Sequence, residues 1–196
     1  HEHFIKTYNK ETIVIHNAVN IPDSLEPNSN ILKEYGLSKN SYYLFIARIT
    51  KEKGLEYLIR AFEKLETDRK LIIAGPFNPE TDSYHYKLKK MAEKDNRIVF
   101  IGFVSGENKI SLLQGAYAYC LPSESEGFSV ALLEAMSYGK CCIVSDIPSN
   151  VEAISNCGIT FKSKDAKELH KVLKRIDKNI EKSNKLGQMA RERVIT

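Results

Sequence analysis

Two glutamates eight positions apart, Glu126 and Glu134, have the clearest chemical potential in this sequence. Glu126 stands before a glycine, where a loop is predicted to turn into a helix, and Glu134 lies about 12 Å further along that helix. The start of a helix exposes backbone N–H groups at its positive end, which suits a phosphate. Carboxylates on either side can accept hydrogen bonds from hydroxyl groups. The layout fits a ligand with a diphosphate between two polyhydroxyl rings, as in a nucleotide sugar.

Helix capping alone would explain Glu126, because acidic residues favour the first turn of a helix. It explains Glu134 less well, because apolar residues surround that position from Val130 to Met136. A carboxylate in so apolar a stretch is costly unless it faces a polar partner. We therefore favour a binding role for the pair.

Two cations follow the first predicted strand of the main domain, Tyr42–Ala47: Arg48 and, before a glycine, Lys53. An Arg fork and a Lys ammonium at one rim would offset the charge of a diphosphate. Taken alone, ordinary surface cations explain this motif at least as well. After a later strand, Phe103 or Val104 could lie against a flat base, although a turn glycine and a core aromatic fit equally.

The elements that must position these residues alternate between strands and helices, so the fold class is α/β. We expect a Rossmann-like, doubly wound parallel sheet with helices on both faces, because the strand runs are apolar almost throughout. Ligands of such sheets bind beyond the carboxyl ends of the strands. The predicted strands are Ile13–Ile15, Tyr42–Ala47, Lys70–Ala74, Ile98–Ile101, Tyr117–Leu121, Cys141–Val144 and Ile159–Phe161. The predicted helices are Ser29–Tyr35, Leu55–Leu65, Ser83–Glu93, Glu107–Gly115 and Phe128–Tyr138.

Three segments are expected along the chain. Residues 1–20 read as an inter-domain linker with a first strand, 21–164 as the nucleotide-sugar-binding domain, and 165–196 as one or two charged helices. The sequence begins without an initiator Met and stops inside a helical pattern without a terminating signal, so we expect a piece of a longer protein.

Composition indicates a globular protein, with 42% hydrophobic and 28% charged residues and a net charge of +4. No apolar run reaches the ~20 residues of a membrane span. From residue 162 onward, the sequence has eleven Lys or Arg residues and five Asp or Glu residues. A solvated helix surface is the preferred interpretation, peripheral contact with an anionic membrane the second, and nucleic-acid binding is not expected. The four cysteines show no metal spacing and are expected as reduced core thiols, which favours a cytoplasmic location.

Taken in order, these motifs resemble the C-terminal half of a family 4 retaining glycosyltransferase of the GT-B fold. That pattern has an Arg after the first strand of this half, a Lys-Gly five residues on, and a Glu, seven residues, Glu signature. The matching residues are Arg48, Lys53-Gly54, Glu126 and Glu134, with weaker matches that include Pro122-Ser123 and Glu152. The resemblance covers roughly residues 11 to 175, and the ordered set is far more specific than any single piece.

The resemblance implies roles for these residues. Arg48 and Lys53 would bind the donor diphosphate and stabilise the leaving group, Glu126 would contact the transferred sugar, and Glu134 the ribose hydroxyls. Backbone N–H groups of Gly127, Phe128 and Ser129 would add contacts, and Val104 would lie near the base. No metal and no cofactor are expected, because the cations take the metal's place and the nucleotide sugar is a substrate. Ser129 stands where the family often has Gly, which puts the identity of the sugar in doubt.

The function implied is transfer of a sugar from a UDP- or GDP-linked donor to a glycan or lipid-linked acceptor. The acceptor would bind an N-terminal domain absent from this chain, so the piece alone is expected to be inactive. The protein would be cytoplasmic, with possible peripheral contact at the inner membrane face. Two alternatives stay open: a GT-B nucleotide-sugar epimerase and a non-catalytic nucleotide-binding module.

Overall fold

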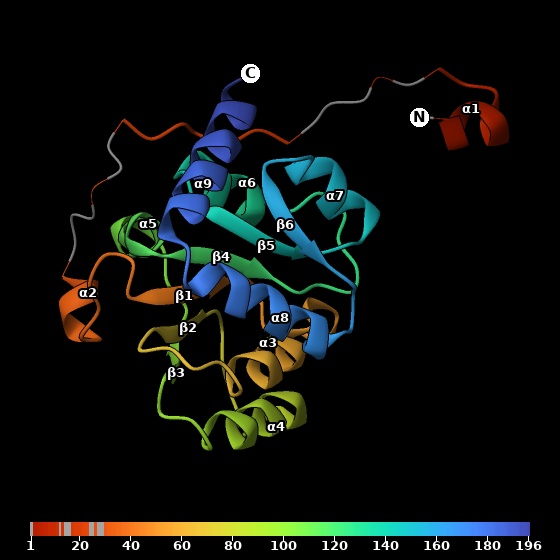
Figure 1. Cartoon of the computed structure of the whole chain (residues 1–196). Helices are drawn as coiled ribbons and strands as arrows, with labels where there is room; N and C mark the ends of the chain where they lie inside the picture. Colours follow the sequence, from red (N-terminus) through yellow and green to blue (C-terminus); the bar gives the residue numbers. More distant parts are fainter. Residues whose placement is uncertain (1, 12, 14–16, 24–25, 27–29) are drawn as a thin grey trace.

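A computed structural model describes the chain except for residues 1, 12, 14–16, 24–25 and 27–29. Its centre is one six-stranded sheet with the order β3-β2-β1-β4-β5-β6, and all five strand pairs are parallel (Figure 1). The strands are β1 Tyr42–Ile46, β2 Lys70–Ala74, β3 Ile98–Gly102, β4 Ala118–Leu121, β5 Cys141–Ser145 and β6 Gly158–Phe161. The expected Rossmann-like α/β fold is confirmed.

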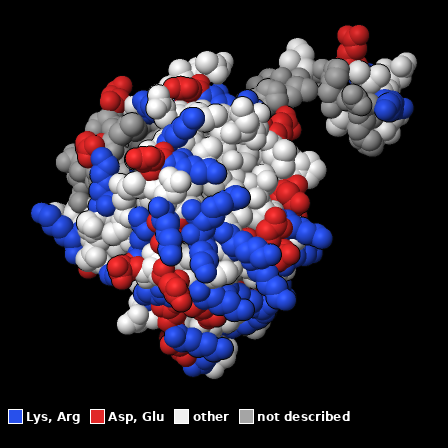
Figure 2. Space-filling view, in the orientation of Figure 1, with Lys and Arg blue, Asp and Glu red and all other residues white. Residues whose placement is uncertain are grey.

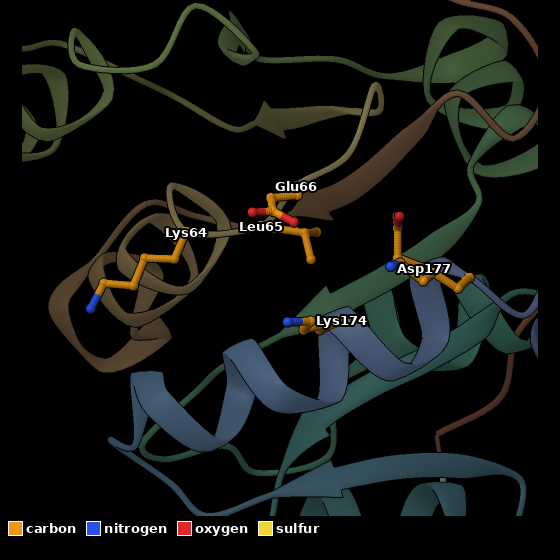
Figure 3. Close-up of a pocket in the computed structure, with 6 residues that line it drawn as sticks. Lys64, Leu65, Glu66, Lys174 and Asp177 are labelled. Carbon is orange, nitrogen blue, oxygen red and sulfur yellow. The ribbon is translucent and has the colours of Figure 1, made fainter.

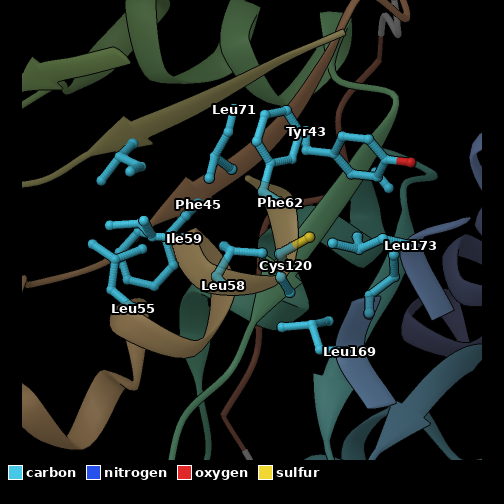
Figure 4. Packing of buried hydrophobic residues seen from close by; sticks show 14 of the residues in the cluster. Tyr43, Phe45, Leu55, Leu58, Ile59, Phe62, Leu71, Cys120, Leu169 and Leu173 are labelled. Carbon is cyan, nitrogen blue, oxygen red and sulfur yellow. The ribbon is translucent and has the colours of Figure 1, made fainter. Parts of the chain in front are cut away.

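Helices cover both faces of this sheet. The α-helices are α1 Glu2–Tyr8, α2 Ile31–Glu34, α3 Leu55–Phe62, α4 Ser83–Ala92, α5 Gly106–Gly115, α6 Val130–Ser137, α7 Pro148–Ile154, α8 Ala166–Asp177 and α9 Ile180–Ile195, and a short 3-10 helix, η1, spans Lys51–Lys53. Successive side chains of a strand point to opposite faces. Accordingly, Tyr43 and Phe45 join a core with α3, α4 and α8, whereas Tyr42 and Leu44 join a core with α2, α5, α6 and α7. Figure 4 shows the first core, in which Phe62 of α3 packs against Tyr43 of β1 and Leu173 projects from α8.

The order of the strands reverses between β1 and β4. The chain runs from β1 outward to β2 and β3, then returns to place β4 on the other side of β1, where Tyr43 pairs with Ala118 and Leu44 with Tyr119. A crevice opens at such a switch point, because the loops after the two strands leave toward opposite faces. The loops after β1 and β4 carry Arg48, Lys53 and Glu126.

Most predicted elements are present, with shifted boundaries. Helix α6 begins at Val130 rather than Phe128, and α3 ends at Phe62 rather than Leu65. The expected single or double C-terminal helix is the pair α8 and α9. Of the strand expected at Ile13–Ile15, the structure describes only Ile13, which is irregular and 90% exposed; the rest lies outside the described residues, as does Ser29. Helices α1 and α7 were not predicted.

The C-terminal helices carry apolar faces inward and charge outward. Leu169, Leu173 and Ile176 of α8 are fully buried. Figure 2 shows Lys and Arg gathered over the face where α8 lies, and its exposed cations are Lys167, Lys171, Lys174 and Arg175. Within the described ranges, no helix combines the length and the apolar character needed to cross a bilayer.

All four cysteines are buried free thiols, as expected. Burial is also the first cause that raises the pKa of Cys141 to about 12. A thiol with so high a pKa is a poor nucleophile. These residues therefore act as small apolar side chains.

Candidate functional site

The loops after β1 and β4 touch at the switch point because Gly54 has no side chain. Its φ of 64° is left-handed, and an added Cβ would lie 2.1 Å from the carbonyl oxygen of Pro122. Beside it, the N–H of Glu124 donates to the carbonyl of Glu52 at 2.7 Å. The Lys-Gly pair predicted from sequence therefore lets one loop lie directly on the other.

This close approach joins Lys53 to Glu126. The ammonium nitrogen Nζ lies 2.6 Å from Oε1 of Glu126, and the side chains are only 14% and 8% exposed. The hydroxyl of Ser123, itself fully buried, donates to the same oxygen at 2.6 Å. A buried ion pair is costly unless further hydrogen bonds satisfy it. The pair therefore places a cation and an anion, both nearly enclosed, at the end of β4.

The loop that carries Glu126 is held from its other side by Glu124. Tyr57 donates to this carboxylate at 2.8 Å, and Lys164 lies 2.7 Å from its other oxygen. The Lys164 hydrogen bond is the main reason why the pKa of Glu124 is lowered. Burial, followed by the bond to Glu124, raises the pKa of Tyr57 to about 12. Both groups thus keep their hydrogen-bonding states through the neutral pH range.

Arg48 differs from Lys53 in having no carboxylate in contact with it among the residues that the structure describes. It is exposed, directly beyond the end of β1, and it forms no hydrogen bond or ion pair with the part of the chain that the structure describes. The loop after β1 that carries Arg48 is nevertheless held in place by His85 of α4. The N–H of Asn78 donates to Nδ1 of His85 at 3.0 Å, which assigns the ring hydrogen to Nε2, and Nε2 donates to the carbonyl of Ile49 at 2.6 Å.

His85 was not identified from the sequence. Its two partners come from loops that follow different strands, and no local pattern marks such a contact. The buried ring, only 9% exposed, thereby ties the loop after β1 to the loop after β2.

The start of α6 is capped by Ser129. Its hydroxyl accepts the N–H of Leu132 at 3.3 Å, so this serine is the N-cap and Gly127 and Phe128 precede the helix. Asn17 donates to the carbonyl of Phe128 at 2.9 Å and ties the N-terminal segment to this turn. The N–H groups of Gly127 and Ser129 donate to none of the described residues. They are open to a ligand, as a phosphate site requires.

Glu134 faces a cleft beside this turn. The cleft has a volume of about 530 Å³ and lies between α5, α6 and the segment 18–20. In it, Oε1 of Glu134 lies 2.5 Å from Nζ of Lys109, the polar partner that the apolar surroundings of Glu134 require. Tyr138 lines the same cleft, and burial followed by the charge of Glu134 raises its pKa. The volume is within the range of sites for small molecules.

Two further predictions concern side chains at the rim. Val104 is 9% exposed and packs into the core with α5, so little of its side chain can meet a ligand. The neighbouring Phe103 is 72% exposed. Glu152 lines a second cleft of about 540 Å³, which also includes Asn17 and Phe128.

A small cavity at the opposite edge of the sheet does not suit a nucleotide. Figure 3 shows it between the end of α3 and the end of α8, where Glu66, Lys174 and Asp177 are among its lining residues. Its volume is about 50 Å³, far below the roughly 300 Å³ of a small ligand site. The carboxyl edge is therefore the candidate site.

Comparison with known proteins points to one family. The family model described as "Glycosyl transferases group 1" matches residues 28–193. An uncharacterized glycosyltransferase of Methanocaldococcus jannaschii is 33% identical over 151 residues, which are 73% of this chain and 38% of that protein. The N,N'-diacetylbacillosaminyl-diphospho-undecaprenol alpha-1,3-N-acetylgalactosaminyltransferase of Campylobacter jejuni is 32% identical over 141 residues, which are 70% of this chain and 35% of that protein.

Solved structures share the fold. Anabaena HepE, solved in complex with UDP and glucose, superposes with a TM-score of 0.82 at 20% identity, over 93% of this chain and 52% of that one. The chain thus spans about half of HepE and less than half of the two relatives.

Proposed function

Because this chain belongs to the glycosyl transferases group 1 family, we propose that it is the donor-binding half of a retaining glycosyltransferase that uses a UDP- or GDP-linked sugar. The expected family resemblance is confirmed by the family model. The residue roles, the donor and the stereochemistry are proposals, supported by the geometry of the switch point.

The contact between Lys53 and Glu126 is the observation that carries this proposal. In a nucleotide sugar, the bond that breaks joins the anomeric carbon to a diphosphate oxygen. A site for this reaction needs a cation next to the diphosphate. Beside that cation it needs a group that accepts hydrogen bonds from the hydroxyls of the sugar. Lys53 and Glu126 supply them 2.6 Å apart, in an enclosed place where electrostatic stabilisation is strong.

The other residues fit around this centre. Arg48, which is exposed, would bind the diphosphate together with Lys53, and the N–H groups of Gly127, Phe128 and Ser129 would add hydrogen bonds. Glu134 would accept the ribose hydroxyls, and the base would lie toward Val104 and Phe103. When the anomeric bond breaks, its electron pair passes to the diphosphate oxygen. The acceptor oxygen bonds to carbon, and its proton passes to the departing diphosphate.

The acceptor is proposed to be a glycan or lipid-linked glycan held by a part of the protein outside these residues. The Campylobacter relative is named for a diphospho-undecaprenol acceptor. A protein with such an acceptor would work at the cytoplasmic face of a membrane, and the cationic face of α8 would suit contact with anionic lipids.

Calorimetric titration tests donor binding directly. UDP, GDP, ADP and their sugar conjugates would be titrated into this chain and into Lys53→Ala and Glu134→Ala variants. We expect one diphosphate to bind saturably and both variants to bind it more weakly. Lys51→Ala is the matched control, because Lys51 is an exposed cation on the same short helix η1.

The two alternatives make different predictions. An epimerase would isomerise the donor without any acceptor, which an assay of the full-length protein would detect. A non-catalytic module would keep its function when Arg48 is replaced by Ala. Absence of binding by every diphosphate to the full-length protein would overturn the donor-site proposal.

A further inference from the structure

Lys109 is a residue for which neither the sequence motifs nor the proposed mechanism supplies a role. It lies in α5, one turn after the first residue, Gly106, and it lines the cleft that Glu134 faces. The two partners come from different helices and are 25 positions apart in the chain. Their contact therefore depends on how α5 and α6 pack, and not on local sequence.

The contact is partly shielded from water. The Lys109 and Glu134 side chains are 29% and 27% exposed, in contrast to the pair Lys90–Glu93, whose side chains are 52% and 46% exposed. Exposed pairs contribute little because water and salt screen them. The Lys109–Glu134 pair is shielded enough to constrain a side-chain conformation.

Lys109 gives Glu134 a polar contact that its neighbours along α6 do not supply. The neighbours Ala135 and Met136 are fully buried and Leu133 is 7% exposed, so the glutamate is the polar position in an otherwise apolar turn. Lys109 is the cation in contact with it among the residues that the structure describes. The contact engages Oε1, and no hydrogen bond to Oε2 is found among those residues. A carboxylate held by one oxygen retains the other as an acceptor.

We propose that Lys109 is a positioning residue: it holds the Glu134 carboxylate toward the cleft so that this group can accept the ribose hydroxyls of the donor nucleotide. The inference rests on the proposed function, because it assigns Lys109 to the ribose subsite of the same site. Lys109 acts through Glu134 and does not itself bind the diphosphate.

A direct role for Lys109 predicts a different dependence on the ligand. If its ammonium met a phosphate, losing it would weaken every nucleotide equally. If the ion pair only competed with the ligand for Glu134, losing it would strengthen binding. If Lys109 positions Glu134, its loss matters only when the ligand carries the ribose hydroxyls.

The test crosses a protein substitution with removal of a ligand hydroxyl, in the manner of a double-mutant cycle. Dissociation constants of UDP, GDP and their 2'-deoxy forms would be measured for the wild-type chain, Lys109→Met and Lys109→Arg. We expect Lys109→Met to weaken the ribonucleotide that binds by about tenfold, the scale of one charge-assisted hydrogen bond. Its effect on the 2'-deoxy form should be below about twofold, and Lys109→Arg should restore most of the affinity.

Lys90→Met is the matched control, because it removes a lysine from a helical ion pair away from the cleft. Thermal unfolding of each variant would verify folding. Equal weakening of ribo and deoxy forms, no weakening, or tighter binding by Lys109→Met would each overturn the inference while the donor site stands. A full-length wild-type protein that binds no diphosphate would overturn the proposed function, and the inference with it.

Discussion

At the amino edge of the sheet, Oδ1 of Asp177 accepts hydrogen bonds from Tyr43, Thr67 and Arg69, each at 2.9 Å. Arg69 also donates to the carbonyl of Asn40 and lies 3.8 Å from the ring centre of Tyr117. At the carboxyl edge, Arg48 has no such partner among the described residues, and Lys53 has one carboxylate. Both edges thus carry cations and carboxylates, but those at the amino edge are saturated by the protein itself.

This difference predicts which charged residues affect the stability of the fold and which affect ligand binding. A charge surrounded by protein partners contributes to folding and has nothing left to offer a ligand. A cation with free donors contributes little to folding but is ready to bind an anion without giving up protein contacts. The comparison predicts that substitutions at the amino edge change stability alone, whereas replacing Arg48 changes binding and transfer alone. Replacing Lys53, which is paired with Glu126 and 14% exposed, should change both.

The largest effect is expected from Asp177→Ala. The side chain of Asp177 is 8% exposed, and its removal leaves the partly buried cation of Arg69 without its carboxylate. Breaking such a pair costs roughly 3–5 kcal/mol. Chemical denaturation would measure the loss, and nucleotide affinity, measured where the variant is folded, should stay unchanged. A clear change in affinity would break the separation between the two edges.

Arg48→Ala should give the opposite result. Because Arg48 forms no hydrogen bond or ion pair with the described residues, the melting temperature should stay within about 2 °C of wild type, as for most surface substitutions. The transfer rate of the full-length protein should fall by roughly 10²-fold or more, the scale of losing one preorganised electrostatic contact. Steady-state kinetics would measure it, and an unchanged rate would support the non-catalytic alternative.

His85→Ala tests whether the Arg48 loop must be held in place. Removing the ring leaves the carbonyl of Ile49 and the N–H of Asn78 without their partners. We expect transfer to slow by about tenfold, since misplacing a binding group is costly. Arg48→Ala combined with His85→Ala should then be no slower than Arg48→Ala alone. Additive losses would mean that His85 acts on the site by another route.

The smallest effect concerns the pH dependence of Lys140, also at the amino edge. Its ammonium donates to the carbonyls of Gln114 and Ala116, and burial lowers its pKa to about 8. The unfolded chain, with a pKa near 10.5, binds more protons above pH 8. The free energy of unfolding should therefore rise with pH, relative to Lys140→Met, by about 1 kcal/mol per unit between pH 8 and 9.5. A flat difference would show that the amine titrates normally.

Most of the fold could be predicted from the sequence because buried parallel strands are apolar almost throughout. It did not reveal α7, because Pro148 reads as a loop residue, although the structure places it in the first turn of the helix, where proline is well tolerated. The start of α6 was predicted two residues early, at Phe128, because the helical pattern alone does not mark Ser129 as the residue before the helix. The structure shows that it caps the helix.

The candidate site was predictable only where it follows strand ends. Arg48, Lys53 and Glu126 stand at the ends of two strands that a doubly wound sheet must bring together, and the structure places Lys53 against Glu126. The partners of Glu134 and of the Arg48 loop, Lys109 and His85, depend on helix packing. Such contacts have no signature in a single sequence. The roles assigned to all these residues remain predictions.

The placement of β4 beside β1 has a consequence for how the protein is made. During synthesis, β1, β2 and β3 emerge first and can pair in order, but the other edge of β1 stays open until residues 118–121 arrive. Glu126 and Glu134 follow later still. Long-range parallel pairing forms slowly. A growing chain that ends before residue 126 has Lys53 without the carboxylate of Glu126, so the proposed donor site is incomplete. The proposed nucleotide-sugar site can therefore be complete only after the second half of the sheet has docked on the first.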